Sequence, residues 1–399
     1  MNKLTELLTR GVDAIYPTRE SLEDVLKKGK KLRLYQGFDP TGTQLHIGHM
    51  IGLRKLRQWQ DLGHHVIFLI GDGTGQAGDP SGKKKSREKY FTREELRQNA
   101  TDYVKQASKI VRFDGKNPVE ILFNGDWLNK LTLVDLLQIA GHFSLQQLSE
   151  RDIFQQRIQK GESVNLREFL YPLLQAYDSV AMSVDLEVGG SDQTFNMLAG
   201  RTLVKATQNR DKFVMTTPLL ADSKGVKIGK TEGNVVALTD NPKDLFGKIM
   251  ALPDEIIVKG LEYLTDVPID EIQSIELTMT KGTNPIQYKK LLAYHIVKQL
   301  HSEEHAKTAE VAFQRVVQQD ELPSVIPEYI YSGNPQETII DLLTKTKLVA
   351  SKSEAKRLVE QGGIEIDSQK ITDPTERIAI TDNMLLKLGK RRFIRIKYT

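Results

Sequence analysis

The sequence predicts an α/β fold: a Rossmann-like, doubly wound parallel sheet in the first domain, then an α-helical domain and a small α+β domain. Short apolar runs alternate with helical patterns through the first 240 residues, strand patterns stop after Asp240, and β-rich pieces return near the end. Strands separated by helical stretches are typical of parallel sheets, because parallel neighbours are usually connected through a helix. The predicted domain boundaries are residues 1–238, 239–325 and 336–399.

Four short, largely apolar runs are the predicted strands of the sheet: residues 32–38, 66–70, 119–123 and 186–188. The second run is uninterrupted and ends at a glycine, which is typical of a strand buried on both faces. A helical pattern over residues 47–62, with Gly63 as its stop, connects the first two strands. At the N-terminus, Leu4, Leu7, Leu8 and Ile15 predict one docked amphipathic helix. Ligands bind beyond the carboxyl ends of such strands, where the polar loops of this sequence fall.

The segment from residue 241 to residue 321 shows helical patterns over residues 242–250, 254–263 and 285–300. Asn241 is a good N-cap, and Pro242 suits a first helical position because its missing N–H costs nothing there. The Pro-containing segment 322–335 is predicted to be a linker. From Gln336, two short helical patterns precede β-rich pieces at residues 363–366 and 392–396.

The composition is that of a globular protein with a basic tail. The 399 residues are 39% hydrophobic and 27% charged, enough for two or three domains with sizeable cores. The net charge is only +4, and from Glu337 onward 13 Lys and Arg stand against 9 Asp and Glu, so the whole excess lies in the tail. A basic appendage on a neutral body fits a polyanionic partner, and a solvated surface is the alternative.

Several classes of protein are excluded or disfavoured. The chain has no cysteine, so disulfides, thiol catalysis and thiolate metal sites are excluded. No metal site is predicted, because His46 and His49 alone among the eight histidines have a ligand-like spacing. No run approaches the ~18 apolar residues of a membrane span, and the N-terminus lacks the apolar core of a signal peptide. We therefore expect a cytoplasmic protein with no membrane partner.

The strongest chemical signal is the segment 39–49, Asp-Pro-Thr-Gly-Thr-Gln-Leu-His-Ile-Gly-His, which follows a predicted strand and opens a helix. The N–H groups and dipole at a helix N-terminus favour phosphate. His46 and His49 lie on one helix face and can donate hydrogen bonds to phosphate oxygens. Gly48 has no side chain, so a flat base can approach the backbone there. The alternative is a pair of histidines that only satisfies a helix start.

A second signal is the segment 227–231, Lys-Ile-Gly-Lys-Thr, within the loop of residues 222–234. Lys227 and Lys230 lie three residues apart around a glycine and form a mobile cationic clamp. Such a clamp suits a transition state whose charge spreads over a transferring phosphate and its leaving pyrophosphate. Taken alone, the segment favours an ordinary basic surface loop over such a clamp.

Together the two segments resemble the two signatures of the class I aminoacyl-tRNA synthetases. The second departs from the commonest Lys-Met-Ser-Lys-Ser form at three of its five positions but keeps both lysines. Residues 35–41, 78–83, 171–178 and 189–193 resemble those of bacterial tyrosyl-tRNA synthetases, and with the tail the resemblance covers nearly the whole chain. It implies that the protein activates tyrosine with ATP, accompanied by Mg²⁺, and loads tRNA(Tyr), with no cofactor held by the protein.

The resemblance also implies the tyrosine site. Tyr171, Gln175 and Asp178 are spaced four and three apart, so on a helix they form one polar stripe. Similarity places Tyr171, Gln175 and Asp79 around the amino group, and Asp178 with Tyr35 at the phenol hydroxyl. A buried carboxylate that must accept the ligand's O–H is left unpaired by phenylalanine. The alternative is a hydrogen-bonded core network. The resemblance adds Gly37, Asn124 and Gln193 to the tyrosine site, and Asp39, Thr41 and Asp192 to the ATP site with Gly48.

For catalysis the resemblance implies charge stabilisation by His46, His49, Lys227 and Lys230, with Thr231 beside them. No protein nucleophile or general base is required. Lys83 and Arg87 are implied to lie in a loop that closes on pyrophosphate, although a basic run is more often simply solvated. Two departures from the family are Gln36, where a cysteine is frequent, and Thr194-Phe195, which replaces a common Trp-Gly pair.

The tail, at residues 348–363, resembles the small RNA-binding fold named for ribosomal protein S-four. Ser351 is a predicted N-cap with Glu354 as its capping-box partner. Lys352, Lys356 and Arg357 would project from that helix toward phosphates, and a general basic helix is the alternative. The resemblance further implies a homodimer, with its interface around the insertion of residues 131–158.

Three other functions share some of these features. A tryptophan-specific enzyme of the same fold is the nearest, and the Asp178–Tyr35 pair argues against it. A non-catalytic RNA-binding protein on a synthetase scaffold would not need both intact signatures. A nucleotidyltransferase acting on a metabolite would have no use for the helical middle and the basic tail.

Overall fold

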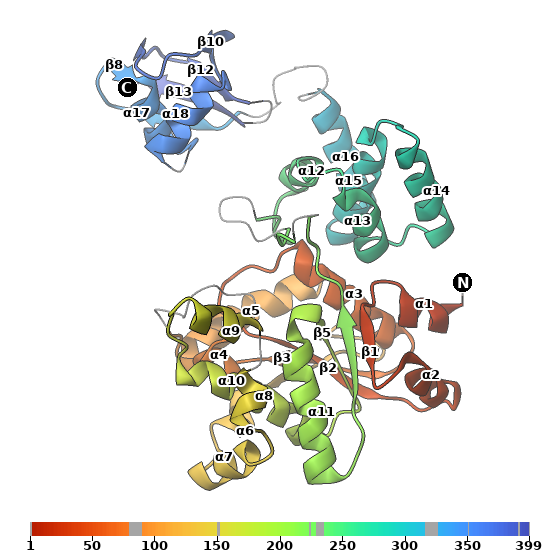
Figure 1. Ribbon diagram of the computed structural model, residues 1–399. Helices are drawn as coiled ribbons and strands as arrows, with labels where there is room; N and C mark the ends of the chain where they lie inside the picture. Colours follow the sequence, from red (N-terminus) through yellow and green to blue (C-terminus); the bar gives the residue numbers. More distant parts are fainter. Residues whose placement is uncertain are drawn as a thin grey trace. The chain divides into compact units, whose positions relative to one another are not determined.

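The computed structural model describes residues 2–79, 90–149, 152–222, 225–228, 235–315, 326–349, 351–389 and 392–398. The chain forms two compact units (Figure 1). The first contains Met1–Asp240 and Leu252–His301, and the second contains Asn241–Ala251 and Ser302–Thr399. Within the described ranges, no helix has the length and apolar character that a membrane crossing requires.

The first unit is built on a six-stranded sheet in the order β1-β6-β5-β2-β3-β4. The strands are Ala14–Tyr16 (β1), Arg33–Phe38 (β2), His65–Ile70 (β3), Glu120–Phe123 (β4), Leu186–Gly190 (β5) and Phe213–Thr217 (β6). β1 is antiparallel to β6, and the other neighbours are parallel. Because β3 and β4 extend from one side of β2 and β5 and β6 from the other, the topological switch point lies between β2 and β5.

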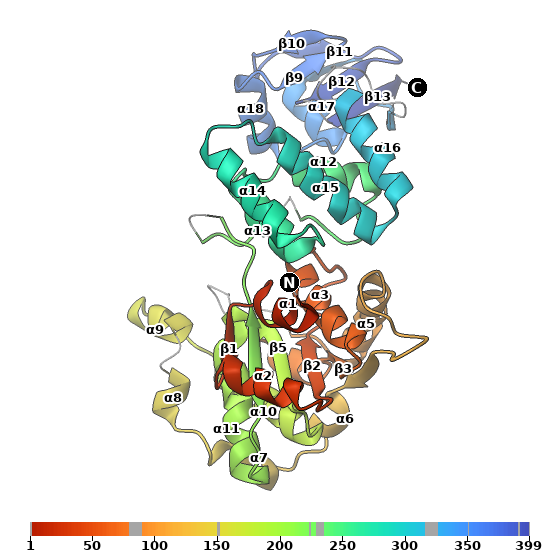
Figure 2. The ribbon, with the colours of Figure 1, turned by 90° about the vertical axis from the view of Figure 1, so that its right-hand side faces the viewer.

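Helices cover both faces of this sheet, as can be followed in Figures 1 and 2. The N-terminal and central helices are α1 (Lys3–Thr9), α2 (Arg19–Lys27), α3 (Ile47–Asp61), α4 (Thr74–Ala77), α5 (Arg93–Ala107), α6 (Gly125–Leu128), α7 (Leu133–Ala140), α8 (Leu145–Ser149), α9 (Asp152–Gln159), α10 (Leu166–Ala181) and α11 (Thr194–Gln208). Along β2, Phe38 faces α3, with its ring 6.4 Å from that of His49. Tyr35, on the opposite face, is buried with Met182 and Val184, which follow α10. Side chains alternate along a strand, so α3 and α10 lie on opposite faces of the sheet.

The four predicted strands are confirmed, but the N-terminal prediction was wrong in part. Ile15 belongs to strand β1, whereas the helix ends at Thr9. The break is local: Arg10 is extended and Gly11 has φ +61°, in the left-handed region that glycine adopts readily. Strands β1 and β6 were not predicted, because β1 has only three residues and neither run shows a clear alternation.

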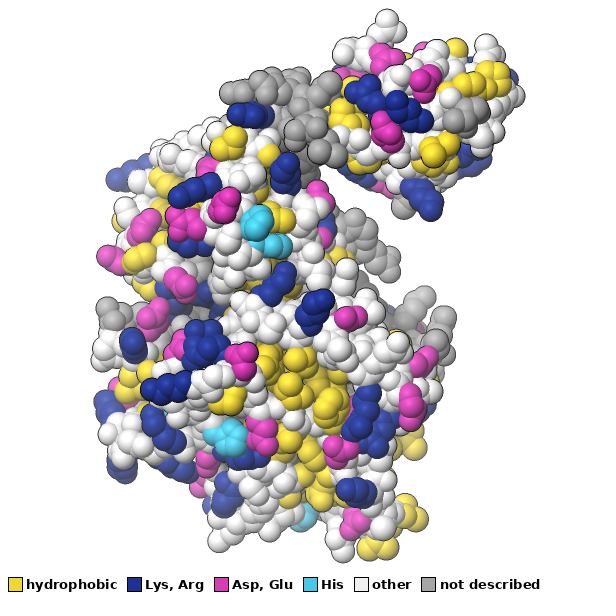
Figure 3. Space-filling model, turned by 180° about the vertical axis from the view of Figure 1, so that it is seen from behind, with side chains coloured by type: hydrophobic (Ala, Val, Ile, Leu, Met, Phe, Trp, Pro, Cys, Tyr) yellow, Lys and Arg dark blue, Asp and Glu magenta, His cyan; other side chains and the backbone are white. Residues whose placement is uncertain are grey.

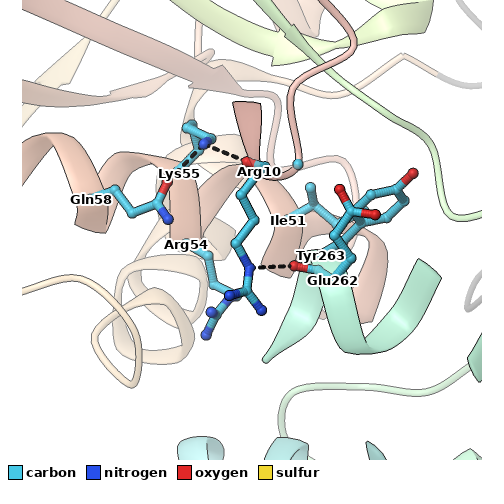
Figure 4. A pocket seen from close by; sticks show the side chains of 8 residues that line it. Arg10, Ile51, Arg54, Lys55, Gln58, Glu262 and Tyr263 are labelled. Carbon is cyan, nitrogen blue, oxygen red and sulfur yellow. Dashed lines mark hydrogen bonds between the residues drawn. The ribbon is translucent and has the colours of Figure 1, made fainter. Parts of the chain in front are cut away.

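The helices α13 (Ile256–Leu264), α14 (Ile269–Thr280) and α15 (Ile286–Leu300) complete the first unit. Arg10 fastens the C-terminus of α13, because its guanidinium donates to the carbonyl oxygens of Leu261 (3.2 Å), Glu262 (2.8 Å) and Thr265 (2.6 Å). Lys55 of α3 in turn donates to the carbonyl oxygen of Arg10 at 2.7 Å (Figure 4). Cationic donors satisfy the unpaired carbonyls at a helix end, so α13 is tied to the same helix that begins at His46.

In the second unit, α12 (Pro242–Met250) packs on α16 (Glu303–Phe313), with the rings of Phe246 and Phe313 5.5 Å apart. A five-stranded sheet follows, in the order β10-β9-β12-β13-β7, together with a β11-β8 pair. Its helices are α17 (Ile339–Lys345) and α18 (Lys352–Glu360). The strands are β7 (Glu328–Tyr331), β8 (Gln336–Thr338), β9 (Ile364–Ile366), β10 (Gln369–Ile371), β11 (Arg377–Ala379), β12 (Leu385–Leu388) and β13 (Arg392–Tyr398).

The predicted linker at residues 322–335 is corrected in its second half. Residues 322–325 lie outside the described ranges, but Glu328–Tyr331 form β7, parallel to β13. Tyr331 is buried in the core of this sheet. Pro327 and Pro335 flank the strand and suggested a linker, but proline is tolerated beside an edge strand, which is the place of β7.

Charged side chains of both signs are interspersed over the face drawn in Figure 3. On the part of that face that belongs to the first unit, hydrophobic side chains gather in a band between them. This face therefore does not carry charge of a single sign.

Candidate active site

The predicted phosphate site begins where α3 begins. His46 is the N-cap residue: its Nδ1 accepts the backbone N–H of Gly48 at 3.1 Å, and Nδ1 of His49 accepts the backbone N–H of His46 at 3.1 Å. The two rings lie 4.0 Å apart. Since each Nδ1 accepts a backbone hydrogen bond, the proton of each neutral ring resides on Nε2, which is a donor. The pair thus both caps the helix and presents two N–H donors.

The second predicted segment lies beside this helix start. A Cβ placed on Gly48 would lie 4.0 Å from the carbonyl oxygen of Ile228, and His46 forms a β-bridge with Ala237. Lys227 Nζ donates to Asp192 Oδ2 at 2.6 Å, which joins this segment to the turn after β5. The structure therefore brings His46, Lys227 and Asp192 together from three distant parts of the chain. Lys230 and Thr231 lie outside the described residues.

Asp39, directly after β2, connects this strand to helices α10 and α4. Its two carboxylate oxygens accept hydrogen bonds from Tyr171 Oη at 2.9 Å and Thr74 Oγ1 at 2.7 Å. Gly71 makes this possible, because a Cβ there would lie only 1.9 Å from Asp39 Oδ1. The backbone N–H of Thr41 donates to the carbonyl oxygen of Asp39 at 2.7 Å and fixes the turn toward α3.

Asp178 is the buried carboxylate of the site, 2% exposed. Oδ2 accepts from Asn124 Nδ2 at 3.0 Å, and Oδ1 accepts from Trp127 Nε1 at 2.8 Å. Burial raises the pKa of Asp178 well above its usual range, and the two donors act in the opposite direction because they favour the ionised form. Asn124 Nδ2 also donates to Thr74 Oγ1 at 2.9 Å, so Asp178 and Asp39 belong to one hydrogen-bonded network.

The predicted polar stripe of α10 faces the sheet and the loops that follow β2 and β4. Tyr171 contacts Asp39 after β2, Asp178 contacts Asn124 after β4, and Gln175 Nε2 donates to Glu187 of β5 at 2.9 Å. One helix thus contacts the residues that follow two strands, β2 and β4, and a residue near the start of a third, β5. Tyr171 is buried, and its burial, followed by the charge of Asp39, raises the pKa of its hydroxyl well above the ordinary value.

Tyr35 lies on the same side of the sheet, with its hydroxyl 3.0 Å from Ser179 Oγ. Its pKa is raised well above the ordinary value, first by burial and then by the charges of Glu187 and Asp178. The hydroxyl therefore stays protonated and remains a hydrogen-bond donor at neutral pH. Gly37 lies two residues further along β2 and has no side chain. A Cβ at this position would be 3.9 Å from Leu69 Cδ2, which is an ordinary van der Waals contact.

Asp79 and Gln193 form a separate contact at the edge of the site. Gln193 Nε2 donates to Asp79 Oδ2 at 2.9 Å, and Gln193 Oε1 accepts from Asn196 at 2.8 Å. Asp79 is the last residue described before a gap, and Lys83 and Arg87 fall within residues 80–89, outside the described ranges. Over the part of the chain that is described, no group of three or more His, Asp or Glu residues could hold a metal ion.

Sequence reasoning missed five polar residues of this network: Thr74, Trp127, Ser179, Glu187 and Lys212. Glu187 and Lys212 form a buried ion pair. One signal was available, because Glu187 stands inside the apolar run Leu186-Glu187-Val188. A charge at a position that a buried strand fills with apolar side chains indicates a buried partner. Lys212 gave no such signal, because it stands before β6 among other charged residues and not inside an apolar run.

In the tail, Ser351 caps α18 as predicted, accepting the backbone N–H of Glu354 at 3.2 Å. Lys352 and Lys356 project from this helix with side chains 70% and 62% exposed. Lys352 pairs with Asp341 of α17 at 2.7 Å, and Lys356 lies 4.0 Å from Glu360. Arg357 is also exposed on α18.

Comparison with known proteins gives the family of the chain. The family model "tRNA synthetases class I (W and Y)" matches residues 27–318, and "Tyrosine--tRNA ligase SYY-like C-terminal domain" matches residues 318–396. The chain is 42% identical to the tyrosine–tRNA ligase of Thermotoga maritima, with 98% of this chain and 96% of that protein covered. It is 41% identical to that of Dehalococcoides mccartyi, with 98% of each covered.

A crystal structure of a C-terminally truncated mitochondrial tyrosyl-tRNA synthetase from Coccidioides posadasii is similar in fold, with a TM-score of 0.62 and 26% identity. The match covers 78% of this chain and 91% of that one. Because the two family models together span most of the chain and the similarity to these ligases is full-length, the chain belongs to the class I tRNA synthetase family of tryptophan and tyrosine enzymes, within its tyrosine–tRNA ligases.

Proposed function

We propose that this protein activates L-tyrosine with ATP and transfers the tyrosyl group to the 3′-terminal ribose of tRNA(Tyr). One observation carries the proposal. A continuous hydrogen-bonded network runs from Asp178 through Asn124 and Thr74 to Asp39, at the turn that leads into the His46 helix. A site that reads a phenol at one end and a triphosphate at the other requires such a connection between the two.

At the phenol end, Asp178 accepts the ligand's O–H and Tyr35 donates to the phenol oxygen. Both are buried, so a ligand without a hydroxyl leaves two polar groups unpaired, which costs more than the lost hydrogen bonds alone. Tyr171, Gln175 and Asp79 surround the amino group of the ligand, with Asn124, Gln193 and Gly37 completing the pocket wall. The burial of Asp178 and its two neutral donors support this assignment.

At the phosphate end, the tyrosine carboxylate attacks the α-phosphate of ATP and pyrophosphate leaves, giving tyrosyl-adenylate. The ribose hydroxyl of the tRNA then attacks the acyl carbon, and AMP leaves as the hydroxyl proton is lost. His46 and His49 donate to phosphate oxygens, while Lys227 and Lys230 stabilise the charge that develops on the transferring group.

The remaining ATP contacts are assigned by resemblance and by position. Asp39, Thr41, Gly48 and Asp192 lie around the base, ribose and phosphates. The ion pair of Asp192 with Lys227 supports this, because it brings the turn after β5 to the predicted lysine segment, so that ribose and phosphate contacts can lie side by side. Thr231, Lys83 and Arg87 belong to the pyrophosphate side. Mg²⁺ enters with ATP, held mainly by phosphates and water.

The tail supplies RNA binding in this proposal. Residues 1–238 form the catalytic domain, residues 239–325 the helical anticodon-binding domain, and residues 336–399 the RNA-binding domain. Lys352, Lys356 and Arg357 contact tRNA phosphates from α18, and the high exposure of the two lysines supports this. The place of action is the cytoplasm.

A homodimer is the second part of the proposal. Three large apolar side chains of α7 are exposed: Leu133 (71%), Val134 (62%) and Leu137 (62%). Leu145 of α8 is exposed to 71% as well. These residues fall within the insertion of residues 131–158, and neighbouring exposed apolar side chains of this kind mark protein–protein contacts.

ATP–pyrophosphate exchange measured with each of the twenty amino acids tests the proposal. Exchange with tyrosine alone, followed by charging of total tRNA with labelled tyrosine, is expected. Exchange with tryptophan would reassign the site to the other specificity of the family, and an absence of exchange with all twenty would leave a non-catalytic RNA-binding protein.

A further inference from the structure

A buried cation lies behind the tyrosine site. Lys212 precedes β6, its side chain is 0% exposed, and it pairs with Glu187 of β5, whose side chain is 2% exposed. Lys212 Nζ also donates to Ser179 Oγ at 2.7 Å. Burying two charges costs several kcal/mol per ion before their attraction is counted, and replacing such a pair by apolar residues is often neutral or stabilising. Stability alone therefore does not explain why the pair is here.

The space around this pair is shaped for it. Gly200 of α11 faces the ammonium group: a Cβ there would lie 2.6 Å from Lys212 Nζ and 2.9 Å from Ser179 Oγ. Any larger residue in the middle of this helix would displace both groups. Glycine destabilises a helix interior relative to alanine, so its place here favours the ion pair over the helix.

The pair contacts two residues of the tyrosine site on separate arms. Glu187 Oε1 accepts the side-chain amide of Gln175 at 2.9 Å. On the other arm, Ser179 Oγ lies 3.0 Å from the hydroxyl of Tyr35. Lys212 itself touches neither the proposed ligand position nor the phosphate end, so any role in the reaction is exerted through these neighbours.

The number of protons restricts the hydrogen-bond polarity of the second arm, in which either Ser179 or Tyr35 can be the donor. Ser179 Oγ has one proton and two acceptor positions, and an ammonium group can only donate. Lys212 therefore occupies one acceptor position of Ser179. The serine proton has two acceptors within reach: the Tyr35 oxygen at 3.0 Å, and Glu187 Oε2 at 3.4 Å, which already binds Lys212. The shorter contact favours Tyr35 as the acceptor.

We propose that Lys212, paired with Glu187, is a positioning residue for tyrosine specificity: it polarises Ser179 so that Tyr35 accepts from the serine and donates its own proton to the phenol oxygen of the substrate. The inference rests on the proposed function of the site. The donors then run in one direction, from Lys212 through Ser179 and Tyr35 to the phenol, whose proton goes to Asp178. Without the ammonium, both acceptor positions of Ser179 are open to the Tyr35 proton, and Tyr35 then donates to Ser179 in place of the substrate.

The test is the double variant Lys212→Met/Glu187→Gln, assayed by pyrophosphate exchange. It removes both charges together. The side-chain oxygen of the new glutamine at position 187 can still accept the hydrogen bond from Gln175. We expect kcat/KM for tyrosine to fall about tenfold, the loss of one hydrogen bond to the substrate, mostly through KM. The low kcat/KM for phenylalanine should change by less than about twofold, because phenylalanine never makes that bond.

Ser179→Ala, with the ion pair intact, should give the same selective loss and does not depend on how well the double variant folds. The matched control is Lys205→Met/Asp211→Asn, which removes an exposed Lys–Asp pair near the same turn and should leave both substrates unaffected. Equal losses for tyrosine and phenylalanine in Ser179→Ala, or an unchanged ratio between them, would overturn the inference. A wild-type protein without tyrosine-dependent exchange would instead overturn the proposed function.

Discussion

Trp127 donates its indole N–H to Oδ1 of Asp178 at 2.8 Å, while Asn124 donates to Oδ2 at 3.0 Å. Both partners are neutral, so the carboxylate is oriented without being neutralised by a cation at these contacts. Each oxygen keeps a further lone pair for a ligand O–H. Burial raises the pKa of Asp178 because it disfavours the ionised carboxylate, and a hydrogen-bond donor offsets this effect. A phenol that donates to Asp178 is therefore favoured over a ligand that has no such donor.

Asp178→Asn should therefore remove tyrosine activation selectively. The amide offers one neutral acceptor in place of two charged oxygens, and its NH₂ would face the Asn124 or Trp127 donor. We expect kcat/KM for tyrosine to fall about 10²-fold, the scale of a hydrogen bond to a charged group together with an unpaired buried neighbour, with a much smaller effect on phenylalanine. Pyrophosphate exchange with both amino acids measures this, and an unchanged thermal unfolding temperature excludes misfolding as the cause. A proportional loss for both would contradict the assigned role.

His46→Asn separates the two functions of this histidine. Asparagine is a favoured N-cap and can still accept the Gly48 N–H, so α3 should keep its stability. The phosphate donor is lost, and removal of one preorganised donor typically lowers kcat by about 10²–10³. We expect that loss in exchange, with tyrosine affinity by calorimetry unchanged. His142→Asn, at an exposed position, is the control. Weakened tyrosine binding in the His46 variant would place the residue elsewhere in the reaction.

His64 predicts a pH dependence of stability. Its Nδ1 accepts the backbone N–H of Leu32 at 3.1 Å, and burial lowers the pKa of His64 to about 4. Between pH 6.5 and 4 the unfolded chain binds a proton that the folded chain does not, so the free energy of unfolding falls as the pH falls. In urea unfolding at pH 7 and 4.5, the wild-type protein should lose about 2 kcal/mol more than His64→Gln over this window. Parallel losses in the two proteins would show that His64 is not the group responsible.

Leu137→Asp tests the proposed dimer. Leu137 is 62% exposed on α7, beside Leu133 and Val134, so an aspartate there should not disturb the core of the unit. It would place a charge in the contact between two copies. The dissociation constant of the dimer should therefore rise several-fold, which shifts the protein toward monomers. Sedimentation equilibrium measures the shift, with Leu277→Asp, at an equally exposed position on α14, as the control. Equal behaviour of the two variants would place the interface elsewhere.

Much of the fold could be predicted because β2, β3, β4 and β5 contain apolar runs that are each followed by a polar loop. The strands β1 and β6 could not, because the three residues of β1 are too few for a pattern and β6 ends in two threonines. The β7 strand was hidden by the prolines on either side of it. These failures share a cause: pairing with a distant strand, which the local sequence does not record, decides whether a short run becomes a strand.

The site divides in the same way. Residues proposed to contact a ligand, such as His46 and Asp178, were predicted from motif and helical spacing. Residues behind them were not: Trp127 and Lys212 reach the site only because the chain folds back, over 51 residues from Asp178 for Trp127 and 33 from Ser179 for Lys212. A lysine next to a strand is normally solvated, so its burial depends on Glu187 and on the gap at Gly200, neither of which is adjacent in the sequence.

A crystal structure with a non-hydrolysable tyrosyl-adenylate analogue tests the central claim most directly. We expect the phenol oxygen within hydrogen-bond distance of both the Asp178 carboxylate and the Tyr35 hydroxyl, and the phosphate group beside His46 and His49. An analogue bound with its phenol turned away from Asp178, or with its phosphate remote from the start of α3, would contradict the account.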